Sequence, residues 1–383
     1  MTLATSLKGR HGRLRVVHVY KDIYPVKGGI ENYVLALAKE QREAHDLDAR
    51  ILVTNTVRET WEGQIEGVPT VKASRLAAAA STPVSTALFA SLRALQPDLV
   101  HLHIPYPVGE LTYLLATGTT PMVATYHSDV VRQATLMRFY APAFDLVLRR
   151  AGAILATSPQ YMRSSPWLRR HRARVRIVPL GIDQRPFRDP SPAVLRLAAG
   201  LRARYGPRVL HSHGVFRYYK GLHTLIEAVK LVPDARLVLT GTGPEDAALH
   251  AQAAVAGLGD RVVFPGPVSD DDLPAYYRAA SLYVLPAVAR SEAFGLSMVE
   301  AQASGLPCIS TDLGTGTSYV NLEGVSGLVV PPSDPPALAH AATTLLDDVA
   351  LRHRLGHQAQ ERAGKLFTLR ADTVVFVYRD ILR

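Results

Sequence analysis

Apolar residues in this chain fall into short runs that alternate with longer stretches in which they recur every three or four positions. The short runs are rich in β-branched residues, which is typical of strands buried on both faces of a parallel sheet. The longer stretches have helical spacing. Two such series follow one another, so the pattern predicts two Rossmann-like α/β domains.

The predicted elements are distributed evenly between the two series. Strands are predicted at residues 14–20, 49–54, 99–103, 122–126, 153–157 and 175–178, and then at 209–214, 236–240, 262–265, 282–285, 308–311 and 327–330. Helices are predicted at residues 30–40, 86–95, 222–230, 247–256, 269–280 and 338–347, with a last helix at 366–382.

A stretch dense in proline and glycine, residues 179–192, separates the two series. We therefore expect a first domain at residues 1–183 and a second at 184–365. The length of 383 residues also favours two cores over one.

The composition is that of an ordinary globular protein, with 48% apolar and 20% charged residues. No apolar run approaches the ~20 residues that span a bilayer. The apolar run after the first basic residues is short for a signal peptide, and we interpret it as a strand. The single cysteine, Cys308, excludes an intrachain disulfide and fits a reducing cytoplasm. A cytoplasmic location is therefore expected.

Positive charge is concentrated in the first half of the chain. Residues 1–190 hold 25 Lys and Arg against 15 Asp and Glu, whereas the remainder holds 18 of each. Such an excess suits a nucleic acid, an anionic membrane surface or a phosphorylated substrate. A solvated basic face is the plain alternative, particularly for the arginine-rich run at 169–176.

Two carboxylates flank a predicted helix start in the segment SEAFGLSMVEAQASGLP, residues 291–307. Glu292 precedes a small turn that contains Gly295, and Glu300 lies eight residues later in an apolar helical run. The first N–H groups of a helix have no internal partner and favour an anion such as phosphate. The two carboxylates would then hold hydroxyls on either side of a bound diphosphate, although an ordinary capped helix has the same spacing.

This segment resembles the E-x7-E motif of the retaining family-four glycosyltransferases. Glu292, Phe294, Gly295, Leu296 and Glu300 match the motif, as do the alanines that follow and the final G-x-P. The resemblance implies a GT-B fold, in which two Rossmann-like domains have parallel sheets that face one another across a cleft. It also implies that the last helix, residues 366–383, crosses back to the first domain.

The pair Gly28-Gly29, with Glu31, lies between the first predicted strand and a helix. Adjacent glycines let a backbone approach a ligand closely, although a tight turn uses them equally well. The segment is similar to the family's G-G-x-E loop. That resemblance implies that Gly28, Gly29 and Glu31 face the donor phosphate and the acceptor.

His127 follows the predicted strand at 122–126, at an edge where sheet ligands bind. A histidine there can donate a hydrogen bond to a hydroxyl or move a proton near neutral pH, while a structural histidine is the plain alternative. The resemblance places His127 close to the transferred sugar and Asp129 near the acceptor. His101 and His103 share one strand face, but no third ligand follows at the spacing of a zinc site, so we expect no metal.

The turn GVFRYYKG, residues 214–221, opens the second series. A basic residue here would neutralise a diphosphate leaving group. The family pattern is G-R-x-x-x-x-K-G. Lys220 matches it, whereas Val215 occupies the usual arginine position. Arg217 lies two residues further on and would point to the same side of an extended segment, so its substitution for the missing arginine is a hypothesis that the sequence leaves open.

Two further turns carry predicted nucleotide contacts. Gly243 lies in GTGP, which lacks the third glycine of a dinucleotide fingerprint but fits the family's G-x-G-P turn. Val268 lies where the family's backbone binds the base. The run at 270–272 of three aspartates is expected to cap a helix and not to bind a metal.

These residues together imply a retaining, metal-independent glycosyltransferase with no cofactor, whose donor is a nucleotide diphosphate sugar. The resemblance assigns Lys220 to the leaving diphosphate, Glu292 to the transferred sugar and Glu300 to the ribose. The run before Gly221 resembles mannosyl- and rhamnosyltransferases of bacterial surface polysaccharide synthesis. We therefore expect mannose from GDP-mannose, a glycan or lipid-linked acceptor, and at most a peripheral contact with an anionic inner membrane face.

Three alternatives remain open at this point. A synthase or phosphorylase acting on soluble sugars would have the same fold. A basic nucleic-acid binder is less favoured, because aromatic residues are not interleaved with the arginines. An NAD oxidoreductase would require a complete G-x-G-x-x-G, which the chain lacks.

Overall fold

The computed structural model describes residues 8–9, 12–26, 28–79, 82–129 and 134–383. The chain divides into two compact units. Unit 1 comprises Met1–Pro179 together with Leu369–Arg383, and unit 2 comprises Leu180–Thr368. These divisions lie within four residues of the expected boundaries.

Unit 1 is built on a mostly parallel sheet. Among the described residues its strand order is β12-β11-β10-β9-β3-β4-β6-β5, and only β5 is antiparallel to its neighbour. The strands are β3 (Arg15–Val19), β4 (Asp48–Thr54), β5 (Trp61–Ile65), β6 (Val68–Ala73), β9 (Leu99–Ile104), β10 (Met122–Tyr126), β11 (Ala153–Ala156) and β12 (Val175–Ile177). Two small antiparallel pairs accompany it, β1 (Lys8–Gly9) with β2 (Gly12–Arg13) and β7 (Ala77–Ala79) with β8 (Thr82–Val84).

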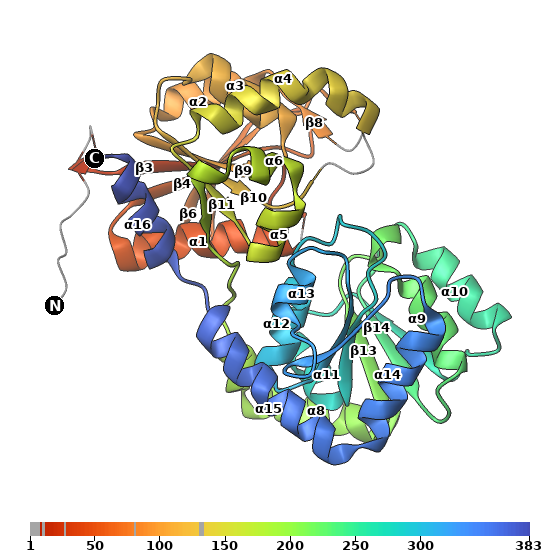
Figure 1. Cartoon of the computed structure of the whole chain (residues 1–383). Coiled ribbons are helices and arrows are strands. Elements are labelled where there is room, and N and C mark those ends of the chain that lie inside the picture. Colours follow the sequence, from red (N-terminus) through yellow and green to blue (C-terminus); the bar gives the residue numbers. More distant parts are fainter. Residues whose placement is uncertain (1–7, 10–11, 27, 80–81, 130–133) are drawn as a thin grey trace. The chain divides into compact units, whose positions relative to one another are not determined.

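Helices cover both faces of this sheet (Figure 1). On one face lie α1 (Gly29–His45) and α16 (Ala371–Ile381); on the other lie α2 (Ala87–Leu95), α3 (Pro107–Ala116) and α4 (Ala134–Arg150). The shorter helices are α5 (Pro159–Ser164), α6 (Pro166–Arg170) and the 3-10 turn η1 (Arg172–Arg174). Covering both faces explains why the parallel strands are continuous apolar runs.

The last helix of the chain belongs to unit 1, as the sequence predicted. Figure 1 shows α16 beside α1, and the Gln41 side-chain amide donates a hydrogen bond to the Tyr378 hydroxyl at 3.1 Å. The helix starts later than expected, because α15 (Val349–Leu366) ends where the predicted helix begins. Phe367 is fully buried and Thr368 pairs with Ile182, so this stretch is extended and not helical.

Unit 2 has a wholly parallel sheet in the order β15-β14-β13-β16-β17-β18. Its strands are β13 (Val209–His213), β14 (Arg236–Thr240), β15 (Val262–Gly266), β16 (Leu282–Leu285), β17 (Cys308–Thr311) and β18 (Gly327–Val330). The strand order reverses between β13 and β16. In an open α/β sheet, ligands bind beyond the carboxyl ends of the strands at such a switch point.

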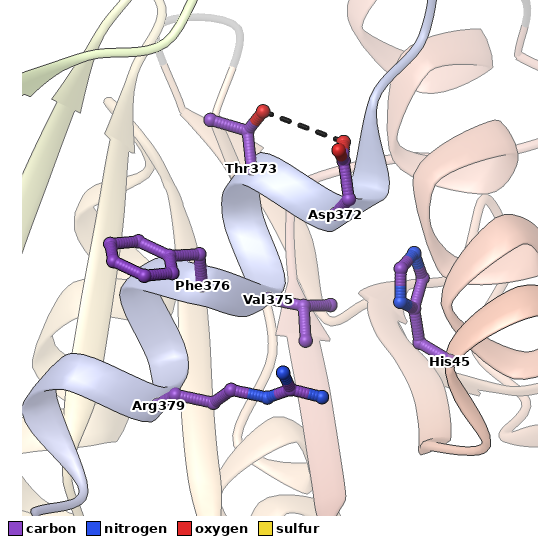
Figure 2. Close-up of a pocket in the computed structure, with 6 residues that line it drawn as sticks. All are labelled: His45, Asp372, Thr373, Val375, Phe376 and Arg379. Atoms are coloured by element: carbon purple, nitrogen blue, oxygen red, sulfur yellow. Dashed lines mark hydrogen bonds between the residues drawn. The ribbon is translucent and has the colours of Figure 1, made fainter. Parts of the chain in front are cut away.

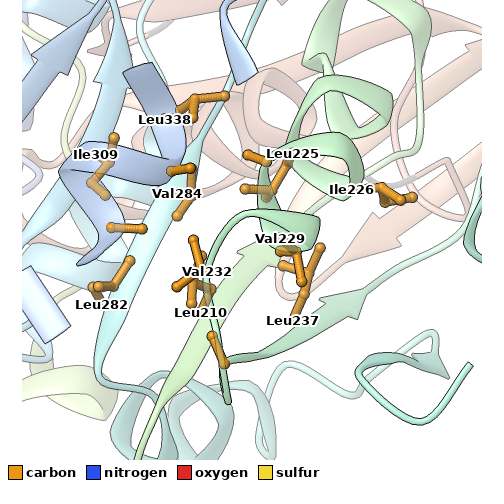
Figure 3. Packing of buried hydrophobic residues seen from close by; sticks show 14 of the residues in the cluster. Leu210, Leu225, Ile226, Val229, Val232, Leu237, Leu282, Val284, Ile309 and Leu338 are labelled. Atoms are coloured by element: carbon orange, nitrogen blue, oxygen red, sulfur yellow. The ribbon is translucent and has the colours of Figure 1, made fainter. Parts of the chain in front are cut away.

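The helices of unit 2 also cover both faces of its sheet. They are α7 (Arg185–Arg188), α8 (Pro192–Tyr205), η2 (Tyr218–Lys220), α9 (Leu222–Lys230), α10 (Asp246–Val255), α11 (Leu273–Ala279), α12 (Leu296–Ala303), α13 (Thr317–Val320), α14 (Pro335–Asp347) and α15. Figure 3 shows the core beneath α9, where Leu225, Val229 and Leu237 pack together. This core makes the sheet a rigid support for the loops at its carboxyl edge.

The predicted strands of both series are present, with bounds that differ by at most one residue. Six described strands of unit 1 were not predicted, namely β1, β2, β5, β6, β7 and β8. In β5 the first four of its five residues are exposed, so this edge strand lacks the apolar run by which the buried strands are recognised. Its pairing with β6 therefore leaves little hydrophobic signal.

The glycine at the start of α9 provides a test of local packing. Gly221 has a φ of +68°, and a Cβ there would lie 2.0 Å from the Pro286 carbonyl oxygen. Gly257 has nearly the same φ, +67°, but open space around it. We expect Gly257→Ala to lower the free energy of unfolding by about 1–2 kcal/mol, and Gly221→Ala by about 3 kcal/mol or more, because steric overlap adds to backbone strain.

Urea unfolding followed by circular dichroism would measure both changes. An equal loss of unfolding free energy in the two variants would contradict the close approach of the Pro286 carbonyl, in the loop after β16, to Gly221.

Candidate functional site

The loops that follow β13 and β16 bring a buried ion pair to the switch point of unit 2. The Lys220 ammonium lies 2.7 Å from the Glu292 carboxylate, and the two side chains are only 15% and 10% exposed. Burial alone would lower the pKa of Lys220, but the Glu292 carboxylate reverses this and raises the pKa above its ordinary value. The ammonium therefore stays charged throughout the physiological range.

Glycines allow the neighbouring loops to pack against each other. A Cβ on Gly241, whose φ is +126°, would lie 2.1 Å from the Gly214 carbonyl oxygen. A Cβ on Gly243 would lie 2.6 Å from the backbone of Phe216, whose N–H donates to the Thr242 carbonyl at 2.9 Å. The loops after β13 and β14 thus form one continuous backbone surface beside Lys220.

Helix α12 begins at Leu296, four residues after Glu292. Its first cap is Gly295, in the left-handed region with a φ of +87°. Phe294 is buried, and Leu296 is the first helical residue. Because the first N–H groups of a helix have no partner within it, this turn offers donors and a partial positive charge to an anion.

Glu300 lies about one turn into α12, and its carboxylate is held by a tyrosine from α11. The Tyr277 hydroxyl donates to its carboxylate at 2.7 Å and to the Ser297 carbonyl at 3.2 Å. Burial raises the pKa of Glu300 to about 7, while the Tyr277 hydrogen bond opposes this shift. Glu300 therefore changes its charge close to neutral pH.

The other predicted residues of unit 2 lie on the same loops. Arg217 is exposed and extended immediately before η2, and its side chain has no partner among the described residues. Val268 is partly exposed after β15. Asp272 occupies the N-cap of α11, but its carboxylate accepts from the Ser269 hydroxyl at 2.8 Å and makes no capping bond.

In unit 1 the two predicted glycines lie at the start of α1. Gly28 is the N-cap, in extended conformation, and Gly29 is the first helical residue. Glu31 is buried in the first turn. A Cβ on Gly28 would lie 2.5 Å from its carboxylate, so the acidic group covers the glycine from one side. Lys27 lies outside the described residues.

Asp129 is held within unit 1 by the residues around it. Its carboxylate accepts hydrogen bonds from the Tyr126 and Ser165 hydroxyls, each at 2.7 Å, and its N–H donates to the Tyr161 hydroxyl. These contacts give Asp129 a clear structural role at the start of its loop.

Four histidines lie side by side in the interior of unit 1. His18 comes from β3, His101 and His103 from β9, and His127 directly follows β10. All are at most 2% exposed. His127 contacts His103 at 3.0 Å, and His103 contacts His18 at 3.0 Å, so the rings form a row beneath the sheet edge.

Burial keeps this row uncharged. It lowers the pKa of His18 to about 4 and that of His127 to about 3, and it lowers the pKa values of His101 and His103 well below their usual range. The surroundings of His127 therefore do not favour proton transfer by this residue near neutral pH. A neutral hydrogen-bonding role suits it better.

The expectation that His101 and His103 lack a third partner was wrong. His18 brings a third imidazole, with ring nitrogens of the three residues within 4.8 Å of one another. The spacing argument missed it because His18 lies on another strand, 83 residues before His101. Both ring nitrogens of each of the three already have hydrogen-bond partners, however, so the cluster is satisfied without an ion.

A separate pocket of about 410 Å³ lies beside α16. Figure 2 shows Asp372, Phe376 and Arg379 of α16 with His45 from the end of α1. None of the predicted site residues lines it. The predicted site residues lie instead beyond the carboxyl ends of the strands in the two sheets.

Comparisons with known proteins agree with these two units. The family model described as "Glycosyl transferase 4-like domain" matches residues 28–181, and that described as "Glycosyl transferases group 1" matches residues 198–362. The D-rhamnosyltransferase WbpZ of Pseudomonas aeruginosa is 37% identical over 93% of this chain and 92% of its own. The O-antigen chain mannosyltransferase C of Escherichia coli is 33% identical over 95% and 97%.

Solved structures show the same fold. Sucrose-phosphate synthase from Thermosynechococcus elongatus superposes with a TM-score of 0.81 at 24% identity, covering 97% of this chain and 99% of its own. Anabaena Alr3699/HepE, solved with UDP-glucose, gives 0.75 at 21% identity, covering 97% and 98%.

The two Rossmann-like units have the GT-B fold that these solved structures share. The chain belongs to the group 1 glycosyl transferases, with a glycosyl transferase 4-like first domain. No helix of its described part is long and apolar enough to cross a membrane.

The switch-point ion pair makes a prediction about stability. Removing one partner of a buried pair leaves an uncompensated charge, which costs about 3–5 kcal/mol. We expect Lys220→Met and Glu292→Gln each to lower the free energy of unfolding by that order, and the double variant to cost less than the sum of the two. A double-mutant cycle by urea unfolding measures this coupling.

The exposed pair Arg185–Asp183, also in unit 2, is the matched control. Its coupling should stay below about 1 kcal/mol. Additive costs at Lys220 and Glu292 would contradict the ion pair.

Proposed function

We propose that this enzyme transfers a hexose of the manno series from a GDP sugar to an acceptor hydroxyl during synthesis of a bacterial surface polysaccharide. The support is its similarity, over nearly the whole chain, to a D-rhamnosyltransferase and to an O-antigen mannosyltransferase. D-Rhamnose is mannose without the hydroxyl at C6, so the two donors share the configuration of the ring. GDP-mannose is the donor we favour.

The single observation that carries this proposal is the buried, charged Lys220 at the switch point of unit 2. A diphosphate leaving group needs positive charge beside it as its bond to the sugar breaks. Lys220 supplies that charge, and the backbone amides that lead into α12, from Phe294 to Leu296, supply hydrogen bonds. Arg217, whose side chain is exposed beside this loop, adds a second cation.

The remaining donor contacts follow from the same loops. Gly243 allows the nucleotide to lie against the backbone after β14, and Val268 contributes backbone to the base. Glu300 accepts hydrogen bonds from the ribose hydroxyls. Glu292 orients the transferred sugar and stabilises positive charge that develops at its anomeric carbon.

We propose that the reaction retains the anomeric configuration. The bond from C1 to the phosphate oxygen breaks while the acceptor oxygen bonds to C1 from the same face. The acceptor proton passes to the departing phosphate oxygen. Glu292 fits a stabilising role in this scheme, because its carboxylate is already paired with Lys220 and is not placed as a free base.

No metal ion is part of the proposed mechanism, since Lys220 and the helix amides supply the charge that a metal would otherwise provide. On the acceptor side, Gly28, Gly29 and Glu31 form the binding loop of unit 1, and His127 contacts a sugar hydroxyl. Asp129 shapes the loop after β10 through its contacts with Tyr126 and Ser165.

Incubation of the purified protein with a panel of nucleotide sugars tests the donor assignment. We expect GDP-mannose to raise the melting temperature most and to be transferred or slowly hydrolysed, because a tightly bound ligand stabilises the folded state. Retention would give an α-linked mannoside by NMR, and activity should survive EDTA. A preference for UDP-glucose with a soluble sugar acceptor would instead favour a synthase of the sucrose or trehalose type.

The ionisation of Glu300 predicts a pH dependence of donor affinity. A carboxylate accepts stronger hydrogen bonds from ribose than a neutral carboxyl does. Because the pKa of Glu300 is raised to about 7, its charged form increases between pH 6 and 8, so the affinity for GDP-mannose should rise over this interval. Isothermal titration calorimetry with GDP-mannose, whose diphosphate does not titrate there, measures the slope.

Glu300→Gln should weaken donor binding more than Glu292→Gln does, and it should remove the slope. Equal, mild losses at both positions, or an unchanged slope in Glu300→Gln, would contradict the assigned roles.

Arg217 provides a separate test of the phosphate site. If it substitutes for the missing arginine at Val215, Arg217→Ala should reduce kcat/KM about tenfold, because a charge-assisted contact with phosphate is lost. Arg196, an exposed arginine of α8 in the same unit, is the matched control and should tolerate alanine. An unchanged donor affinity and turnover in Arg217→Ala would overturn this role.

A peripheral contact with an anionic membrane surface is proposed for unit 1. Helices α3 and α4 pack together and expose Leu115 (76%) and Phe139 (82%), while Arg138 and Arg150 lie exposed on α4. Apolar side chains beside cations suit an anionic bilayer.

Sedimentation with vesicles containing phosphatidylglycerol should recover the protein at low salt and release it at high salt. Equal recovery with purely zwitterionic vesicles would contradict this contact.

A further inference from the structure

The histidine row of unit 1 continues into α1 and α16, and its hydrogen bonds have a defined direction. The Gln41 side chain joins two branches, since its oxygen lies 2.8 Å from His18 Nε2 and its NH₂ group donates to the Tyr378 hydroxyl at 3.1 Å. All members are buried. An amide oxygen only accepts and an amide nitrogen only donates, so Gln41 determines the donor and acceptor at each contact.

The first branch leads from Gln41 to His127. Because the Gln41 oxygen accepts, His18 carries its proton on Nε2 and its Nδ1 is an acceptor. His103 then donates from Nε2 to His18 Nδ1 at 3.0 Å. This leaves His103 Nδ1 as an acceptor, and His127 donates to it from Nε2 at 3.0 Å. Each neutral ring thus donates from Nε2 and accepts at Nδ1, which fixes the same tautomer in the next ring.

The second branch is consistent with this order. The Tyr378 hydroxyl, which accepts from Gln41, donates to His101 Nδ1 at 2.6 Å. His101 then donates from Nε2 to the Thr125 hydroxyl at 2.6 Å. Every contact within the two branches therefore has one donor and one acceptor while all four rings are neutral.

The first branch ends at an atom that has no partner. His127 Nδ1 is buried and makes no hydrogen bond with the part of the chain that the structure describes. A buried polar atom without a partner is rare in folded proteins and commonly marks the position of a ligand or a water. Burial and the nearby Lys21 both lower the pKa of His127, so its ring is neutral and one of its two nitrogens is an acceptor.

We infer that Gln41, His18 and His103 form a tautomer relay that holds His127 Nδ1 as a hydrogen-bond acceptor for a hydroxyl of the bound sugar. This rests on the proposed function for the identity of the hydroxyl as that of a sugar. Gln41, His18 and His103 are positioning residues in this account. They act through His127, which is the only one of these four residues that contacts the substrate.

The relay explains why three histidines are linked in a row although only one of them contacts the substrate. An isolated buried imidazole exists as either of two tautomers, and only one presents an acceptor at Nδ1. The row links the tautomer of His127 to the orientation of the Gln41 amide. The nitrogen of that amide donates to the hydroxyl of Tyr378 in the last helix. A hydroxyl that approaches Nδ1 therefore meets a lone pair that is already oriented, which reduces the cost of ordering on binding.

Long-range ¹H–¹⁵N NMR of the full-length protein, labelled in its 14 histidines, tests the order directly, because it shows which ring nitrogen carries the proton. Comparison with His127→Gln, His103→Gln and His18→Gln assigns the signals. We expect Nε2–H for all three residues at neutral pH. A proton on Nδ1 of His127, or a mixture of its tautomers, would overturn the inference.

Two substitutions of Gln41 separate the relay from simple packing. Gln41→Glu keeps an acceptor toward His18 and should leave the His127 tautomer unchanged. Gln41→Leu leaves His18 Nε2 without an acceptor, so the row should reverse and place the proton on His127 Nδ1. Gln41→Leu should then lose about tenfold in kcat/KM, because a donor replaces an acceptor at the sugar, while Gln41→Glu stays within about twofold of the wild type.

Gln184→Leu is the matched control, because Gln184 is a buried glutamine of unit 2 that donates to the Ala363 carbonyl at 2.7 Å. It should change neither the tautomers nor kcat/KM. Loss of activity in both Gln41 variants with an unchanged His127 tautomer would reduce the row to a packing role. The NMR result on the free protein requires no donor, so it stands or fails independently of the sugar specificity.

Discussion

The buried ion pair between Lys220 and Glu292 is the interaction on which the donor site of unit 2 depends. Two loops meet there because the strand order reverses between β13 and β16. A lysine in that position loses its hydration and keeps its charge only with a carboxylate beside it. The site thus holds a permanent cation where an anionic leaving group is proposed to bind, and the carboxylate that stabilises it lies next to the proposed sugar.

The buried polar cluster of unit 1 differs from this ion pair, because it holds no charged groups. Its histidines are neutral and are joined by hydrogen bonds instead of charges. The proposed functions of the two units therefore differ: unit 2 is proposed to provide charge and helix amides for a phosphate, and unit 1 an oriented acceptor for a hydroxyl. The last helix takes part in the histidine network of unit 1, since the Gln41 side-chain amide donates a hydrogen bond to the hydroxyl of its Tyr378.

Much of this could be predicted from the sequence. Buried parallel strands are continuous apolar runs, so their positions and the two-unit organisation follow from the pattern. The E-x7-E segment and Lys220 follow from motifs that lie within one or two loops. Edge strand β5 was missed because its residues are exposed. The role of His18, Gln41 and Tyr378 was missed because they lie on three separate elements, and only the register of β3 with β9 brings His18 beside His101.

The central claim is that Lys220, held in place by Glu292, binds the donor diphosphate and that their ion pair is not simply a structural contact. Calorimetric titration of GDP-mannose into a Lys220→Met/Glu292→Met double variant tests it most directly, because two apolar side chains preserve the packing without leaving a single buried charge. The account predicts a folded protein whose affinity for GDP-mannose falls at least about tenfold. A folded double variant that binds GDP-mannose as tightly as the wild type would contradict it.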